Sequence, residues 1–166
     1  MTYPYSDEYL VYDYDEHRYI LTEKAVLDKN NISLIERLNF GGAVNQAVQP
    51  QVFLDEISDV VYGEIYDYSS QPAIQEKQIA KCPSARRRIM KAMLKQVDYV
   101  LVNGLLAQYS GVDVRKGTKS PDFSERVLAP LARKELTKPL DETGIPLMYA
   151  GKYPYIFKPD YEKDNY

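Results

Sequence analysis

The chain has 166 residues, which suffices for one domain with a core of its own and without disulfide or metal staples. Its single cysteine, Cys82, excludes an intramolecular disulfide and a thiolate metal site. Charge is sorted along the chain: residues 1–68 carry 13 acidic and 4 basic side chains, net −9, whereas residues 69–136 carry 6 acidic and 13 basic side chains, net +7. Because such sorting governs association more than fold, it indicates assembly rather than catalysis.

The chain begins with the pattern of a β-hairpin followed by two short helices. Residues 9–21 alternate as two strands around a polar tip. Thr22 is a suitable N-cap for a short helix over 23–28. The capping-box spacing of Ser33 and Glu36 predicts a second short helix directly afterwards.

Two longer helices are predicted next. Residues 51–68 place apolar side chains at helical spacing, with acidic residues between them. A short helical segment then ends at Pro83, and Ser84 is the expected cap of the longest helix, 84–110. Gly104 inside that helix predicts a close backbone contact. We expect the two long helices to form the core through seven apolar residues: Phe53, Ile57, Val61, Ile89, Met93, Val97 and Val100.

The last third of the chain is less regular. Residues 112–123 are rich in Gly, Lys, Ser, Pro and Asp and are expected to form an exposed loop. A last helix is predicted over 124–136, although Pro130 leaves open a turn followed by a helix that starts at that proline. Residues 145–151 are expected to form a short strand, and residues 152–166 an extended tail.

These elements predict a mainly α fold. It is a small helical bundle with an N-terminal β-hairpin, a short C-terminal strand and an extended C-terminal tail. We expect residues 1–151 to form a single domain, which residues 152–166 follow.

Motifs that carry chemistry are weak in this sequence. Asp13, Asp15 and His17 alternate as ligands on one strand face would, but a calcium loop starting at Asp13 would have Arg18 where glycine is needed and Lys24 where the bidentate glutamate belongs. We therefore interpret these residues as a solvated hairpin tip. Neither a nucleophile elbow nor a phosphate-binding glycine loop occurs, so we expect no enzyme, no catalytic residues, no cofactor and no metal site.

The sharpest local feature is a run of basic residues on the long helix. Three of them fall at i, i+4 and i+8 and form a ridge beside the apolar stripe. The ridge can contact phosphates, it can face the acidic side of helix 51–68 in a neighbouring subunit, or it can simply be a solvated helix face. The sequence pI of 5.3 argues against DNA as a dedicated ligand. The residues concerned are Arg86, Arg87, Arg88, Lys91 and Lys95 on the ridge, and Asp55, Glu56 and Asp59 on the acidic side.

Tyrosine is unusually abundant, with 16 residues against 4 phenylalanines and no tryptophan. Six lie in the first 19 residues and five in the last 18, so both regions are candidate contact surfaces. The alternative is that these tyrosines cap the edge of the domain's own core. No signal-peptide or membrane-spanning pattern is seen, so the expected location is a cytoplasm.

The order of these pieces resembles the head-tail connector, or adaptor, proteins of tailed bacteriophages. Four segments carry the resemblance, namely residues 17–22 (HRYILT), 52–58 (VFLDEIS), 93–97 (MLKQV) and 147–151 (LMYAG). The last of these looks like the short closing strand that such proteins place after a helix.

The resemblance implies a structural virion protein. Such a protein forms a ring, commonly a dodecamer, between the portal and the tail, and DNA passes through the ring without being read. The implied partners are other copies of the chain, the portal protein, a downstream tail or stopper protein, and DNA in the lumen, with no membrane. The implied location is the virion neck, and the host cytoplasm during assembly.

Two further expectations concern the tail and an alternative function. The aromatic residues of the tail would dock on the portal: Tyr153, Tyr155, Phe157 and Tyr161. The alternative function is a helical nucleic-acid-binding or regulatory module that uses the ridge from Arg86 to Lys95.

Overall fold

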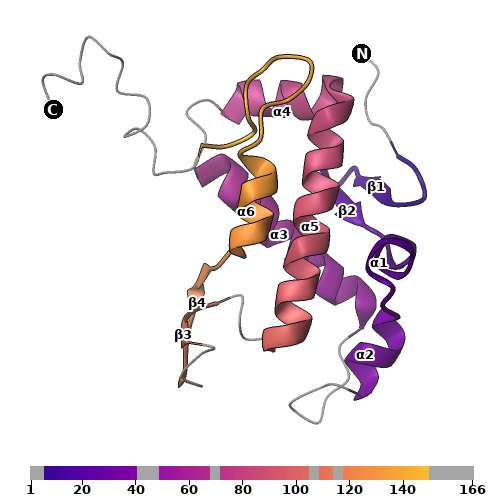
Figure 1. The fold of residues 1–166 in the computed structure, drawn as a ribbon, viewed down its shortest axis with the longest axis vertical. Helices are drawn as coiled ribbons and strands as arrows, with labels where there is room; N and C mark the ends of the chain where they lie inside the picture. Colours follow the sequence, from indigo (N-terminus) through magenta and orange to yellow (C-terminus); the bar gives the residue numbers. More distant parts are fainter. Residues whose placement is uncertain (1–5, 41–48, 68–71, 105–108, 114–117, 150–166) are drawn as a thin grey trace, which may run out of the picture.

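Helix α5 (Pro83–Asn103) runs through the middle of the molecule, and other helices pack around it (Figure 1). This computed structural model describes residues 6–40, 49–67, 72–104, 109–113 and 118–149. The mainly α-helical fold with an N-terminal β-hairpin that the sequence predicts is confirmed. The helices that pack most closely on α5 are α1 (Glu23–Asn30), α3 (Pro50–Asp67), α4 (Pro72–Lys81) and α6 (Pro130–Leu136). Helix α2 (Leu34–Phe40) packs on α1 and α3, and its Arg37 donates to the carbonyl of Leu101 in α5 at 3.4 Å.

The N-terminal hairpin pairs strand β1 (Leu10–Asp13) with β2 (Arg18–Leu21), and helix α3 holds it in place. Its inner face buries two cross-strand pairs, Leu10 with Leu21 and Tyr12 with Tyr19. The backbone N–H of Tyr19 donates to the Tyr62 hydroxyl at 2.9 Å, and the Ser58 hydroxyl donates to the Tyr19 carbonyl, also at 2.9 Å. Two side chains one helical turn apart thus satisfy backbone groups that an edge strand would otherwise leave unpaired.

The helices predicted from periodicity are confirmed. Thr22 caps α1 as expected, because its hydroxyl accepts a hydrogen bond from the N–H of Ala25 at 3.2 Å. The helix predicted over 51–68 is α3, and its bounds differ from the prediction by one residue at each end. The seven residues predicted to form the core, from Phe53 to Val100, are each 1% exposed or less.

The long helix is shorter than predicted because it ends at Asn103 instead of residue 110. Gly104 is its C-cap, with a φ of +103° that favours glycine, and its N–H donates to the carbonyl of Val100 at 2.8 Å. Among the described residues, apart from the adjoining backbone, no atom lies within 4 Å of the position a Cβ would take, so the close backbone contact that the sequence predicts is not found there.

The start of this helix also differs from the prediction. Cys82 is the N-cap, Pro83 occupies the first helical position, and Ser84 lies inside the helix rather than capping it. Proline suits this position because the missing N–H would have no partner within the helix.

The region predicted as an exposed loop forms a second hairpin. Strand β3 (Tyr109–Asp113) pairs with β4 (Thr118–Arg126), and α6 begins only at Pro130. The helix predicted from residue 124 is therefore wrong, and the alternative start at Pro130 is confirmed. Among the described elements these two strands contact chiefly each other, and Figure 1 shows the hairpin extending beyond the helical body below α6.

The strand predicted near the end of the chain is not found over residues 145–149. These residues instead fold back on the core, where Leu147 and Met148 are fully buried. The N–H of Met148 donates to the carbonyl of Leu136 at 3.3 Å. The tail predicted over residues 152–166 lies outside the described residues.

Replacing Phe53 by alanine is expected to lower the free energy of unfolding by about 3–5 kcal/mol, because a buried aromatic side chain is lost and a cavity is left. Urea denaturation measures the change. The matched control is Val52→Ala at the preceding residue, whose side chain is 50% exposed. This variant should lower the free energy of unfolding by no more than about 0.5 kcal/mol. A loss below about 1 kcal/mol for Phe53→Ala would contradict the core described above.

Candidate assembly interface

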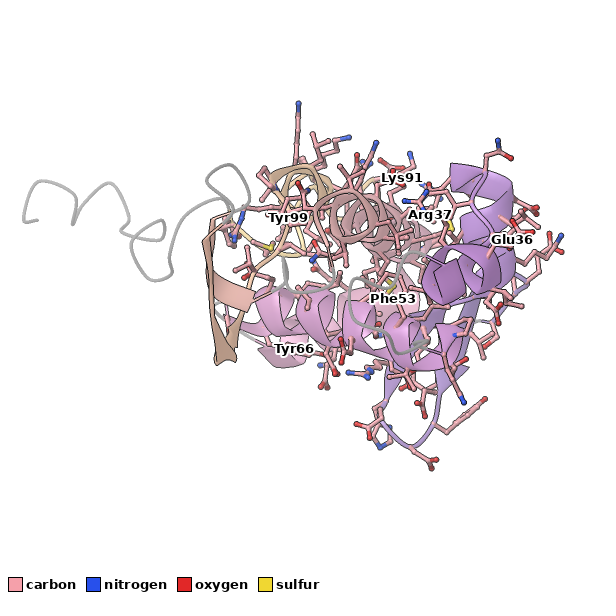
Figure 2. The ribbon with its side chains drawn as sticks, turned by 90° about the horizontal axis from the view of Figure 1, so that it is seen from below. Glu36, Arg37, Phe53, Tyr66, Lys91 and Tyr99 are labelled. Carbon is pink, nitrogen blue, oxygen red and sulfur yellow. The ribbon has the colours of Figure 1, made fainter. Side chains whose placement is uncertain are left out.

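The most exposed side chains in the middle of α5 lie on one stripe, because neighbouring helices bury most of its circumference. Arg87, Lys91 and Lys95 follow one another on this stripe at intervals of four residues, and Val102 continues it at 80% exposure. Figure 2 shows Lys91 pointing away from the body, whereas Phe53 lies inside it. We refer to Arg87, Lys91, Lys95 and Val102 as the α5 stripe.

Two of the five predicted ridge residues are used inside the chain. The Arg86 guanidinium donates to the carbonyls of Ile79 and Ala80, at 3.3 and 3.4 Å, near the end of α4. A cation suits this position because carbonyl groups without helical partners accumulate there. Arg88 is half-buried, donates to the carbonyl of Pro139 at 3.5 Å and lies 4.0 Å from the Glu135 carboxylate. Both arginines therefore hold neighbouring segments against α5.

Arg87 forms an exposed ion pair with Asp141 at 2.9 Å. Their side chains are 55% and 66% exposed, so water screens the pair and its contribution to stability is small. The two lysines of the α5 stripe have no ion-pair partner among the described residues. Burial raises the pKa of the Asp98 carboxyl on the same helix, and the charge of Lys95 opposes part of this effect. The outward charge of α5 thus belongs mainly to Lys91 and Lys95.

The turn at residues 140–144 provides the cap that the start of α5 lacks. Cys82 makes no side-chain capping bond, and the Glu142 carboxylate accepts hydrogen bonds from the backbone N–H of Ser84, at 3.2 Å, and from its hydroxyl. Gln78 on α4 donates to the Thr143 hydroxyl at 3.2 Å, which ties the same turn to a second helix. The hydrogen bonds from Ser84, chiefly the one from its hydroxyl, lower the pKa of Glu142.

Sequence reasoning missed this cap, since Ser84 and Glu142 lie 58 residues apart. One signal was present: a helix starting at Cys82-Pro83 has no side-chain oxygen at its N-cap. The acidic pair Asp141-Glu142, next to Gly144 in a turn, is a suitable external acceptor.

The acidic side of α3 is partly neutralised within the chain. Arg18 of β2 forms an ion pair with Asp59 and donates to the carbonyl of Asp55 at 3.4 Å. The carboxylate of Asp55 accepts from the Gln51 side chain at 3.0 Å. Glu56 is half-buried and has no ion-pair partner among the described residues. Of the three acidic residues predicted to contact a neighbouring subunit, Glu56 has the fewest hydrogen bonds and ion pairs to described residues of its own chain.

The hairpin tip uses its acidic residues for turn formation. Asp13 accepts hydrogen bonds from the N–H groups of Asp15, at 2.9 Å, and Glu16, at 3.2 Å. His17 has a φ of +55°, which completes the reversal into β2. In the described part of the chain, no group of three or more His, Cys, Asp and Glu residues is placed to hold a metal ion.

The remaining sequence candidates are placed as follows. Cys82 is buried, and burial raises the pKa of its thiol, which disfavours the reactive thiolate. Within the described ranges, no helix has the length and apolar content that crossing a bilayer requires. The four aromatic residues predicted to dock on a portal, Tyr153, Tyr155, Phe157 and Tyr161, lie outside the described residues.

Comparison with known proteins finds no match to this chain among protein-family models, curated proteins or solved structures.

Glu142→Gln is expected to destabilise the protein in a pH-dependent way. The folded-state pKa of Glu142 lies below its ordinary value of 4.5, so the stabilisation is complete above pH 4.5 and is lost as the pH falls through the folded-state pKa. Urea midpoints of wild type and variant should therefore differ at pH 7 and approach each other towards pH 3. The control is Glu16→Gln at the exposed hairpin tip, and a difference that is independent of pH would contradict a role for the ionised carboxylate.

Proposed function

We propose that this protein is a structural subunit of a phage neck, where copies of the chain form a ring between portal and tail and DNA passes through without being read. The proposal takes its identity from the resemblance to head-tail connectors. It takes its physical support from two features of the fold, the unsupported second hairpin and the separation of charge between helices. The proposed partners are other copies of the chain, the portal and a tail or stopper protein.

The β3–β4 hairpin is the observation that carries the proposal. Its strands pair with each other, contact the rest of the described chain little and extend beyond the helical body (Figure 1). A two-stranded hairpin by itself is marginally stable in water and usually needs a further surface to pack on. The first hairpin packs on α3, whereas the described contacts of the second are chiefly between its own two strands. A neighbouring molecule in an assembly is the natural source of that surface.

Charge separation supports contacts between unlike faces. The α5 stripe is basic, whereas Glu56 belongs to α3, a different helix of the same chain. If these two surfaces meet only in one direction, the contact is heterologous, and its repetition produces a closed ring when the rotation per subunit permits closure. Unlike charges on two helices are compatible with such a ring.

The alternative function, nucleic-acid binding through the ridge, has less support. Arg86 and Arg88 are engaged inside the chain and Arg87 pairs with Asp141, so the exposed Lys91 and Lys95 are the main cations available to phosphates. So few exposed cations give weak binding without base recognition. Titration of duplex DNA at two salt concentrations would distinguish a dedicated DNA-binding module from an assembly protein.

Electron micrographs of the purified protein, with and without portal, test the proposed function. We expect rings with a central hole, either in the protein by itself or on the portal. Particles of monomer size in both samples, at concentrations far above those of an assembly reaction, would contradict the proposal.

Reversing the charge of the α5 stripe is expected to weaken self-association. Lys91→Glu combined with Lys95→Glu should lower the affinity between subunits by about tenfold or more, because attractive contacts become repulsive. Sedimentation velocity measures the change. Adding Glu56→Lys to the double variant should restore part of the affinity if Glu56 is the partner.

The matched control reverses two other lysines, Lys77 and Lys134, which are exposed on α4 and α6. This control changes the net charge by the same amount and should leave self-association nearly unchanged. Equal losses in both double variants would mean that the net charge, rather than the α5 stripe, controls assembly.

Deleting residues 152–166 is expected to abolish attachment to portal-bearing capsids while changing the thermal midpoint little. The segment has two prolines and few aliphatic residues, so its aromatic side chains are the available anchors. A full-length chain with alanine at Tyr153, Tyr155, Phe157 and Tyr161 separates loss of the anchors from loss of length. A deletion that unfolds the domain, or one that leaves attachment intact, would exclude a docking role for the segment.

A further inference from the structure

A cavity with tyrosine walls lies between the hairpin tip, the second half of α3 and α4, on a different part of the molecule from the α5 stripe. Its volume is about 260 Å³. The described residues that line it are Tyr12, His17, Tyr62, Tyr66, Glu76 and Ile79. Neither the core nor the proposed ring contact requires this space, so its chemistry can be considered separately.

The tyrosine walls are held in place by contacts behind them. The Tyr62 hydroxyl accepts the N–H of Tyr19, and its ring lies 6.1 Å from that of Tyr66 at an interplanar angle of 45°. The Tyr12 ring packs edge to face against Tyr14 and Tyr19, with centroids 5.2 and 5.0 Å away. Aromatic walls that need no rearrangement bind a ligand at lower entropic cost.

The charge of the lining selects the kind of ligand. Glu76 is an exposed carboxylate on the side of α4, and no lysine or arginine is among the described lining residues. A phosphate or carboxylate ligand would therefore be repelled by Glu76, with the His17 imidazole as the one basic side chain among the described lining residues. A cation, in contrast, is attracted both by the π faces of tyrosine rings and by a carboxylate.

The size of the cavity limits the ligand further. Pockets for drug-sized molecules begin at about 300 Å³, so 260 Å³ accommodates a single side chain or a small amine rather than a nucleotide. Ile79 and the tyrosine rings can cover the apolar stem of such a group while its charged end reaches Glu76.

From these observations we propose that the tyrosine cavity binds one ammonium or guanidinium group, presented by a lysine or arginine side chain or by a small amine. This inference does not depend on the proposed role in a phage neck.

Saturation-transfer NMR with pairs of charged and neutral ligands of the same shape tests the proposal on the full chain, whatever its oligomeric state. N-acetyl-arginine amide is compared with N-acetyl-citrulline amide, and n-butylammonium with n-butanol. We expect transfer to both charged ligands and at least threefold weaker binding of their neutral counterparts. Equal binding of charged and neutral ligands, or binding of neither, would overturn the proposal.

Two variants link the signal to the cavity. Glu76→Gln keeps the shape but removes the charge, and it should weaken binding of the charged ligands about threefold or more. The matched control is Glu36→Gln on α2, which Figure 2 places at the opposite side of the molecule from Tyr66. Tyr66→Leu tests the aromatic wall, with the thermal midpoint as a check on folding. Unchanged binding in both Glu76→Gln and Tyr66→Leu would locate the ligand elsewhere and overturn the assignment.

A final comparison distinguishes the two sources of the cation. If Lys91 or Lys95 of a second copy enters the cavity instead of facing Glu56, Lys91→Gln combined with Lys95→Gln should increase binding of n-butylammonium at high protein concentration, because the competing side chains are lost. If neither lysine enters the cavity, the double variant should bind n-butylammonium as wild type does, and at low protein concentration a small amine is the ligand. In either case binding must depend on Glu76.

Discussion

The burial of α5 on most of its circumference is the constraint on which the rest of the structure depends. Helices α1, α3, α4 and α6 pack closely on it, so its core residues from Ile89 to Val100 organise the interior and its most exposed side chains lie mainly on one stripe. The same constraint sorts its basic residues into two roles. Arg86 and Arg88 turn towards neighbouring segments and satisfy carbonyl groups, while Lys91 and Lys95 have only the solvent side available. Packing therefore divides the basic residues of α5 into two groups: two arginines that bind other segments of the chain and two lysines that face solvent.

The two hairpins illustrate the difference between an element that belongs to the domain and one available to a partner. Ser58 and Tyr62 of α3 bond to both backbone groups of Tyr19, and the β1–β2 hairpin thereby becomes part of the core. For β3–β4 the described contacts are chiefly between its own two strands. A two-stranded hairpin is marginally stable by itself in water, and we propose that another molecule provides the surface that completes this one.

Strong periodicity made the helices and the core predictable from the sequence, whereas long-range contacts and weak strands were not predictable. Helix α3 was placed to within one residue because its apolar positions repeat at helical spacing. Strand β4 lacks clear alternation and contains Pro121, which argues against a strand in a local reading. The cap that Glu142 provides for α5 joins residues 58 positions apart, and no local pattern specifies such a pair. In the candidate interface, residue types indicated which side chains are basic, but only packing decided which of them face outward.

Amide hydrogen exchange in the β3–β4 hairpin tests the central claim, that this hairpin is completed by another molecule, most directly. The account predicts fast exchange of amides in residues 109–113 and 118–126 in dilute monomer, and strong protection once the protein has assembled, by itself or on a portal. The amides of β1 and β2 provide an internal reference and should be protected in both states. Slow exchange of the β3–β4 amides already in the monomer, or continued fast exchange in the assembled state, would contradict the account.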